Sequence, residues 1–123
     1  MLIERTVGRQ KIFTEVKKIG NDLLVVIYGG DEHHIGGVAI AYPTTSHYRD
    51  ATTVSVNTIT FPGHKDYIVA TSAAETICKA LSLPVVASVG IHYDAATPSD
   101  IKEIVKAVED MVNELVLHYQ NAE

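Results

Sequence analysis

Short apolar stretches bounded by turn residues fill the first half of the chain, which is typical of β-strands. Residues 6–18 alternate with an imperfect period of two, and the Gly20-Asn21 pair that follows suits a tight hairpin. The run 23–28 is apolar throughout, as expected of a central strand covered on both faces. Pro43 ends a third apolar run, and residues 43–53 are polar enough to form a loop. Four strands are therefore expected, over residues 6–18, 23–28, 35–42 and 53–61.

The second half predicts a helix, a strand and a second helix. Residues 66–81 place one apolar stripe at helical spacing, and residues 84–91 form a β-branched strand. Thr97-Pro98-Ser99-Asp100 is a strong helix start, because Thr97 can cap, Pro98 suits the first helical position and Asp100 can complete a capping box. The helical stripes are Val69, Ala73, Ala74, Ile77, Cys78 and Leu81, and then Ile101, Ile104, Val105, Val108, Met111, Val112 and Leu115.

The expected order of elements is ββββαβα, which predicts an α+β fold: a single-layer antiparallel or mixed β-sheet with two helices packed on it. We expect one domain over residues 1–123. If the first four strands form an up-and-down meander, the second and fourth run the same way. The first helix then carries the chain back, so that the last strand runs parallel to the fourth. The carboxyl ends of the second, fourth and fifth strands therefore share one edge of the sheet.

Composition narrows the class of protein. The 123 residues carry a net charge of −5, which argues against a nucleic-acid surface, and 46% hydrophobic residues argue against disorder. No apolar run approaches the ~20 residues that a membrane-spanning helix needs, and the first residues do not resemble a secretory signal. The single cysteine, Cys78, excludes an internal disulfide and fits a cytoplasmic protein; it lies on a helical stripe, which favours a core position over a nucleophilic one.

Three histidine-containing motifs follow the three strand ends that should share an edge. They are Gly30-Asp31-Glu32-His33-His34-Ile35-Gly36, Pro62-Gly63-His64-Lys65-Asp66 and Gly90-Ile91-His92-Tyr93-Asp94. Imidazoles that converge beside carboxylates suit a divalent transition metal, so His34, His64 and His92 are candidate metal ligands, with Asp31 and Asp94 as partners for their other ring nitrogens. The alternative is that these are ordinary loop histidines. His47 and His118 are read as structural.

A phosphate is a second candidate ligand, because Gly63-His64-Lys65 offers backbone N–H groups and a cation just before a helix. The chain has no glycine-rich nucleotide-binding motif. A His64–Asp66 pair could act in catalysis, but Asp66 could equally cap its own helix.

At these motifs the sequence resembles the LpdD-like prenylated-flavin chaperone domain, the small D-type proteins that accompany hydroxyarylic-acid decarboxylases. The matching stretches are 34–36, 62–66 and 90–97, and the resemblance extends over about residues 30–117. It implies a non-catalytic accessory protein that binds flavin mononucleotide (FMN) or prenylated FMN and helps to supply it to a decarboxylase. His34, His64, His92 and Asp94 would line the site. The doubled His33-His34 departs from the family pattern of one histidine and leaves open which of the two is the ligand.

We expect the cofactor to contact Gly30, His64, Lys65 and Asp94. The metal is inferred from the residues alone and not from the resemblance. The 6–18 strand should lie at a sheet edge, and an uncovered edge favours a homo-oligomer. Arg49 lies in the loop at the opposite edge, so it could reach only a neighbour's site, where a guanidinium suits a flavin phosphate. Two other functions stay open: a small metal-dependent hydrolase or lyase, and a structural subunit of a larger complex.

Overall fold

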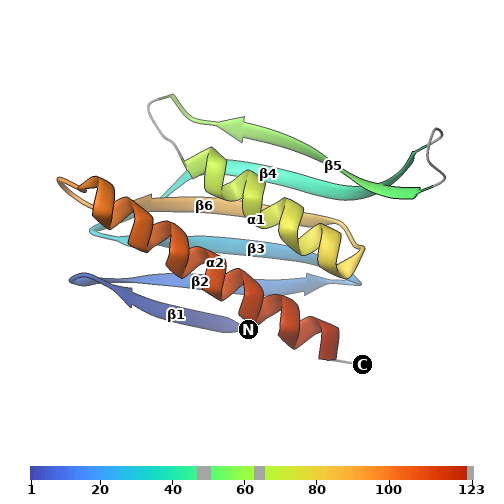
Figure 1. Ribbon diagram of the computed structural model, residues 1–123, viewed down its shortest axis with the longest axis horizontal. Helices are drawn as coiled ribbons and strands as arrows, with labels where there is room; N and C mark the ends of the chain where they lie inside the picture. The colour runs from blue at the N-terminus through green and yellow to red at the C-terminus, as the bar shows by residue number, and fades with distance from the viewer. Residues whose placement is uncertain (47–50, 63–65, 122–123) are drawn as a thin grey trace.

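The computed structural model describes residues 1–46, 51–62 and 66–121. It contains one six-stranded mixed sheet with two helices on one of its faces (Figure 1), which confirms the expected α+β class. The elements are, in chain order, β1 (Leu2–Val7), β2 (Gln10–Ile19), β3 (Asp22–Gly30), β4 (Glu32–Ser46), β5 (Ala51–Thr60), α1 (Asp66–Leu81), β6 (Val85–His92) and α2 (Pro98–Asn121).

The sheet has the strand order β1-β2-β3-β6-β4-β5, so the expected meander is wrong. β6 lies between β3 and β4, parallel to β3 and antiparallel to β4. The reason is hydrophobic: β6 is apolar along most of its length, and a central position covers more of it than an edge would. The strand directions are nevertheless those expected. β4 runs against both β5 and β6, so the carboxyl ends of β3, β5 and β6 share one edge.

The N-terminal segment forms two strands where one was expected. β1 and β2 pair antiparallel around a turn at Gly8, whose φ of 60° lies in the left-handed region that glycine tolerates. β2 is therefore not an edge strand, and the edges of the sheet are β1 and β5. The short edge β1 carries Glu4 and Arg5, and Arg5 bonds Glu114 of α2 at 2.6 Å.

β4 also continues past Pro43, where a loop was expected. Beyond Ala41 this strand pairs only with β5, which tolerates a residue that lacks an N–H group. The β4–β5 ladder runs from Gly37 opposite Thr60 to Ser46 opposite Ala51. Arg49 and His47 lie outside the described residues.

Both helices pack on the same face of the sheet and enclose the core between them and the strands (Figure 1). α1 has the predicted bounds, and most of its predicted stripe is buried, including Cys78; burial raises the pKa of that thiol, as expected of a core cysteine. The α2 stripe is buried from Val108 to Leu115, but Ile101 is exposed, because the first turn of α2 extends beyond the core. Within the described part of the chain, neither helix combines the length and the hydropathy needed to cross a bilayer.

The start of α2 shows the predicted capping box. The Thr97 N–H donates to Asp100 Oδ2 at 2.9 Å, and the Asp100 N–H donates to Thr97 Oγ1 at 3.1 Å. The bond from the Thr97 N–H stabilises the ionised carboxylate of Asp100, and the pKa of Asp100 is lowered accordingly.

We expect Thr97→Ala to lower the free energy of unfolding by about 1 kcal/mol, because it leaves a helix N–H without its acceptor. Urea denaturation followed by circular dichroism measures this. Ser99→Ala, an exposed change in the same turn, is the matched control and should stay within about 0.5 kcal/mol of the wild type. Equal losses in the two variants would contradict a capping role.

Candidate functional site

The candidate site lies where β3 and β6 end and where β4 and α1 begin. His34, in the irregular first part of β4, places its Nε2 atom 3.2 Å from Oδ2 of Asp66. Asp66 is the first residue of α1, and its Oδ1 atom accepts a hydrogen bond from the Ile91 N–H of β6 at 3.2 Å. One carboxylate thus connects a helix, a central strand and the histidine. The packing of α1 against β6 therefore determines where the His34 ring lies.

Glycines permit this close approach. A Cβ atom at Gly36 would overlap the Asp66 carboxylate, and one at Gly37 would lie 2.6 Å from the Tyr67 nitrogen. A Cβ at Gly90 would overlap the carbonyl oxygen of His34. The register between β4 and β6 shifts between His33 and Gly37, so β4 arches over β6 at this point. The motif glycines therefore serve packing of the backbone around the site, whichever ligand it takes.

A second histidine–carboxylate pair faces the first. His92 ends β6, and its Nε2 atom lies 3.0 Å from Oδ1 of Asp94. The His34 and His92 rings meet edge to face, with their centroids 6.4 Å apart. The His34–Asp66 side chains are 24% and 12% exposed, whereas those of His92 and Asp94 are 47% and 72% exposed, so the site has an inner and an outer pair.

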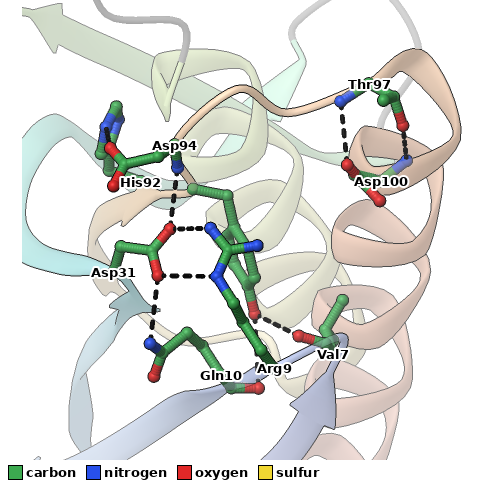
Figure 2. Close-up of polar contacts among 9 residues, drawn as sticks. Val7, Arg9, Gln10, Asp31, His92, Asp94, Thr97 and Asp100 are labelled. Carbon is green, nitrogen blue, oxygen red and sulfur yellow. Dashed lines mark hydrogen bonds and ion pairs between the residues drawn. The ribbon is translucent and has the colours of Figure 1, made fainter.

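Asp31 forms hydrogen bonds that hold the segment around the outer pair in place (Figure 2). Its carboxylate accepts hydrogen bonds from the Arg9 guanidinium, the Gln10 amide and the Asp94 backbone N–H, the last at 2.8 Å. Its own N–H donates to the His92 carbonyl at 2.7 Å. The Asp94 N–H, followed by Arg9 and Gln10, lowers the pKa of Asp31 below its ordinary value, although partial desolvation opposes the shift.

Tyr93, which is buried, connects the same segment to the β1–β2 turn. Its hydroxyl donates to the Val7 carbonyl at 2.7 Å, and the Arg9 guanidinium lies 5.9 Å from the centre of its ring. The segment that carries His92 and Asp94 is thereby tied to the turn between β1 and β2. Sequence patterns do not predict this contact, because Gly8 and Arg9 lie within the single strand expected over residues 6–18, whereas the structure places a turn there.

Neighbouring histidines of the first motif have different surroundings. His33 lies against Phe13 and Tyr28, with ring centroids 6.0 and 5.2 Å away, on the sheet face opposite the helices. His34 points to Asp66 and His92. The structure therefore places His34, rather than His33, beside the other candidate site residues. Gly30 lies at the same edge, opposite His92 in the β3–β6 ladder.

The expected partners of the histidines are partly corrected. Asp94 does bond His92, but Asp31 bonds Arg9, Gln10 and the backbone, and the carboxylate beside His34 is that of Asp66. His64 and Lys65 lie outside the described residues. Across residues 1–46, 51–62 and 66–121, no three side chains of the metal-binding types are arranged to hold an ion. The expected three-histidine metal centre is thus not supported.

The charge of this edge decides which chemistry suits it. Among the described residues, the carboxylates of Asp31, Asp66 and Asp94 gather here, and the guanidinium of Arg9 is paired with Asp31. Such a surface disfavours an anion near the imidazoles. It favours a neutral polar group that donates a hydrogen bond, because an imidazole whose Nε2–H donates to a carboxylate has Nδ1 as its acceptor.

Comparison with known proteins identifies the class. The family model of the prenylated flavin chaperone LpdD-like domain matches residues 6–120. Because this match covers nearly the whole chain, the protein belongs to the LpdD-like prenylated flavin chaperone family. No curated protein matches the sequence significantly.

Among solved structures, the chain resembles one from a chaperone complex for yeast 20S proteasome assembly. The TM-score is 0.52 at 17% sequence identity, and the match covers 94% of each chain. At this identity the likeness shows a shared fold only.

We expect Asp31→Asn to lower the melting temperature by a few degrees, since the amide cannot replace the anion that accepts from Arg9 and from the Asp94 N–H. The pKa of Asp31 is lower in the folded chain than its ordinary 3.8, so its contribution is complete above 3.8 and is lost as the pH falls from there through the lower pKa of the folded chain. In thermal melts from pH 7 to pH 3, the difference between the two proteins should therefore begin to shrink below about pH 4.

Asp110→Asn, which removes an exposed carboxylate from α2, is the control for the change in net charge. It should show no such convergence. A gap between wild type and Asp31→Asn that stays constant down to pH 3 would contradict the assignment.

Proposed function

We propose that the chain binds prenylated FMN, or FMN itself, at the edge formed by the His34–Asp66 and His92–Asp94 pairs, and supplies the cofactor to a decarboxylase. The family supports the cofactor class. The main observation in favour of this site is that the His34 and His92 rings face each other, with their centroids 6.4 Å apart. A flavin ring presents an N–H between two carbonyl oxygens along one edge, and an imidazole whose Nε2–H donates to a carboxylate can accept from that N–H through Nδ1 without a covalent step.

The flavin ring, rather than the phosphate, fits beside the histidines. Asp66 already places a negative charge at the N-terminus of α1, where a phosphate would otherwise be favoured. Asp31 and Asp94 add to the repulsion. The phosphate would then extend away from this edge. Contacts from Lys65, His64 or a neighbour's Arg49 stay predictions, as does the lining role of Gly30.

Supply of a cofactor requires that binding be reversible, and the site has features that suit release. The outer pair is open to solvent, since the His92 and Asp94 side chains are 47% and 72% exposed. Hydrogen bonds to an open edge give moderate affinity, so an apo-decarboxylase with an enclosing site can take the ligand over. An accessory role of this kind, in the cytoplasm and by a single domain, is our proposal for the chain; the decarboxylase itself is unspecified.

The first test is flavin binding by the purified protein. We expect FMN and prenylated FMN to change absorbance and fluorescence on titration, and His34→Asn and His92→Asn each to weaken binding about tenfold, the value of one lost hydrogen bond. His118→Asn, near the end of α2, is the control and should bind as the wild type does. Unchanged affinity in both site variants would overturn the site.

A second experiment tests supply. An apo-decarboxylase of the hydroxyarylic-acid type is mixed with limiting prenylated FMN, with and without the chain, and the rate at which decarboxylation appears is followed. We expect a faster rise with the wild type and a smaller gain with His34→Asn. A rate that is the same with and without the wild-type chain would refute the chaperone role, whether or not flavin binds.

A further inference from the structure

The sheet face opposite the helices is apolar, and no described element covers it (Figure 1). We call it the open face. Its side chains alternate along the strands with those of the core: Val25 and Ile27 are fully buried, while Val26 and Tyr28 between them keep partial exposure. Ile40 and Ile59 are 45% and 69% exposed. The open face consists of Phe13, Leu24, Val26, Tyr28, Val38, Ile40, Tyr42, Ile59, Val86 and Ser88.

The ladder registers arrange these side chains in two rows across the sheet. One row runs Glu15, Val26, Ser88, Val38 and Ile59; the other runs Lys17, Leu24, Val86, Ile40 and Asn57. Each row starts with a charge on β2 and becomes apolar over the central strands. The two charges have opposite signs and stand at the same end of adjacent rows.

Continuous apolar runs in β3, β4 and β6 are the pattern of strands buried on both faces. Residues 1–46, 51–62 and 66–121 supply one layer of helices, on the other face of the sheet, so a second layer would have to come from elsewhere. Every folded molecule exposes this face at all times, which calls for a permanent cover present in equal amount. A second copy of the chain meets that requirement, whereas a decarboxylase engaged only during cofactor transfer would leave the face exposed between encounters.

We infer that two copies pack open face to open face around a two-fold axis that crosses the strands midway between the two rows. This axis places each row of one copy over the other row of the second copy. Glu15 of each copy then faces Lys17 of the other, so the two β2 strands form two pairs of opposite charges across the interface. The small Ser88 lies over the larger Val86 at the centre, which lets the two apolar surfaces interlock.

The size of the face is sufficient. Six strands about 4.8 Å apart and about six residues long give a flat area of roughly 25 by 20 Å per copy. Two such surfaces bury on the order of 1,000 Å², near the lower limit for a stable interface, and side-chain relief adds to it. A patch of about 500 Å² is at the upper end of what monomeric proteins leave exposed.

The interface would reach the edge of the candidate site without covering it. Phe13, Tyr28 and His33 lie on the open face, whereas His34 and His92 lie where β4 meets α1 and β6 ends. His33 is thus assigned to the dimer contact and His34 to the site. The dimer leaves two separate edges free, one in each copy.

Light scattering of the purified chain without flavin tests the inference. We expect twice 13.4 kDa at micromolar concentration. Ile40→Lys should raise the dimer dissociation constant at least about a hundredfold, because it would bury an unpaired charge. Leu117→Lys is the matched control: it introduces the same charge at a residue that is 58% exposed on α2, and it should stay dimeric.

Charge reversal tests the register on exposed positions that the fold tolerates. Glu15→Lys and Lys17→Glu alone should each weaken the dimer several-fold, and the double exchange should restore it, since opposite charges face each other again. This series decides the question even if Ile40→Lys fails to fold. A monomeric wild type, or a dimer that Ile40→Lys leaves intact, overturns the inference; a double exchange no better than the single changes overturns the two-fold register.

Discussion

The burial of three apolar strands is the constraint on which the rest of this structure depends. β3, β4 and β6 each carry apolar residues at consecutive positions, which favours central places in the sheet over its edges. β6 therefore takes the central position between β3 and β4, although it is last in the chain. That placement brings the end of β6 beside the end of β3 and the start of β4, and so assembles the segments that carry His34, His92 and Asp94.

Burial brings these segments together, and polar contacts then hold them in position. Asp66 and Asp31 each use one carboxylate to join three separate segments: Asp66 joins α1, β4 and β6, and Asp31 joins the β1–β2 turn, β3 and the loop after β6. The two carboxylates have no contact in common among the described residues. The inner pair is thus held mainly by packing against glycines, and the outer pair by a charged network nearer the surface. Disturbance of one should leave the geometry of the other largely intact.

Sequence reasoning reached the parts of this fold that local periodicity determines. It found both helices, the α2 cap at Thr97, the central strands and the strand directions that bring His34 and His92 to one edge. It missed the β1–β2 turn, because Gly8 and Arg9 interrupt an alternation that continues on either side, and it missed the insertion of β6, which depends on competition among strands for central places. Long-range pairings such as Arg9 with Asp31 leave no local pattern, so no reading of one sequence could find them.

The polar edge at the strand ends and the apolar open face differ for the same physical reason, namely how their backbone groups are paired. At the strand ends, backbone N–H groups lack partners on a neighbouring strand and donate to carboxylates instead. This edge is therefore polar and acidic, and it can form hydrogen bonds with a neutral ring. On the open face the central strands pair with one another within the sheet, so mainly apolar side chains remain to interact. A surface of the first kind suits a ligand that must leave again, and one of the second kind suits a contact that persists. His33 and His34 show how narrow the boundary is: one residue along β4 moves an imidazole from the apolar face to the polar edge, because successive side chains of a strand point to opposite sides.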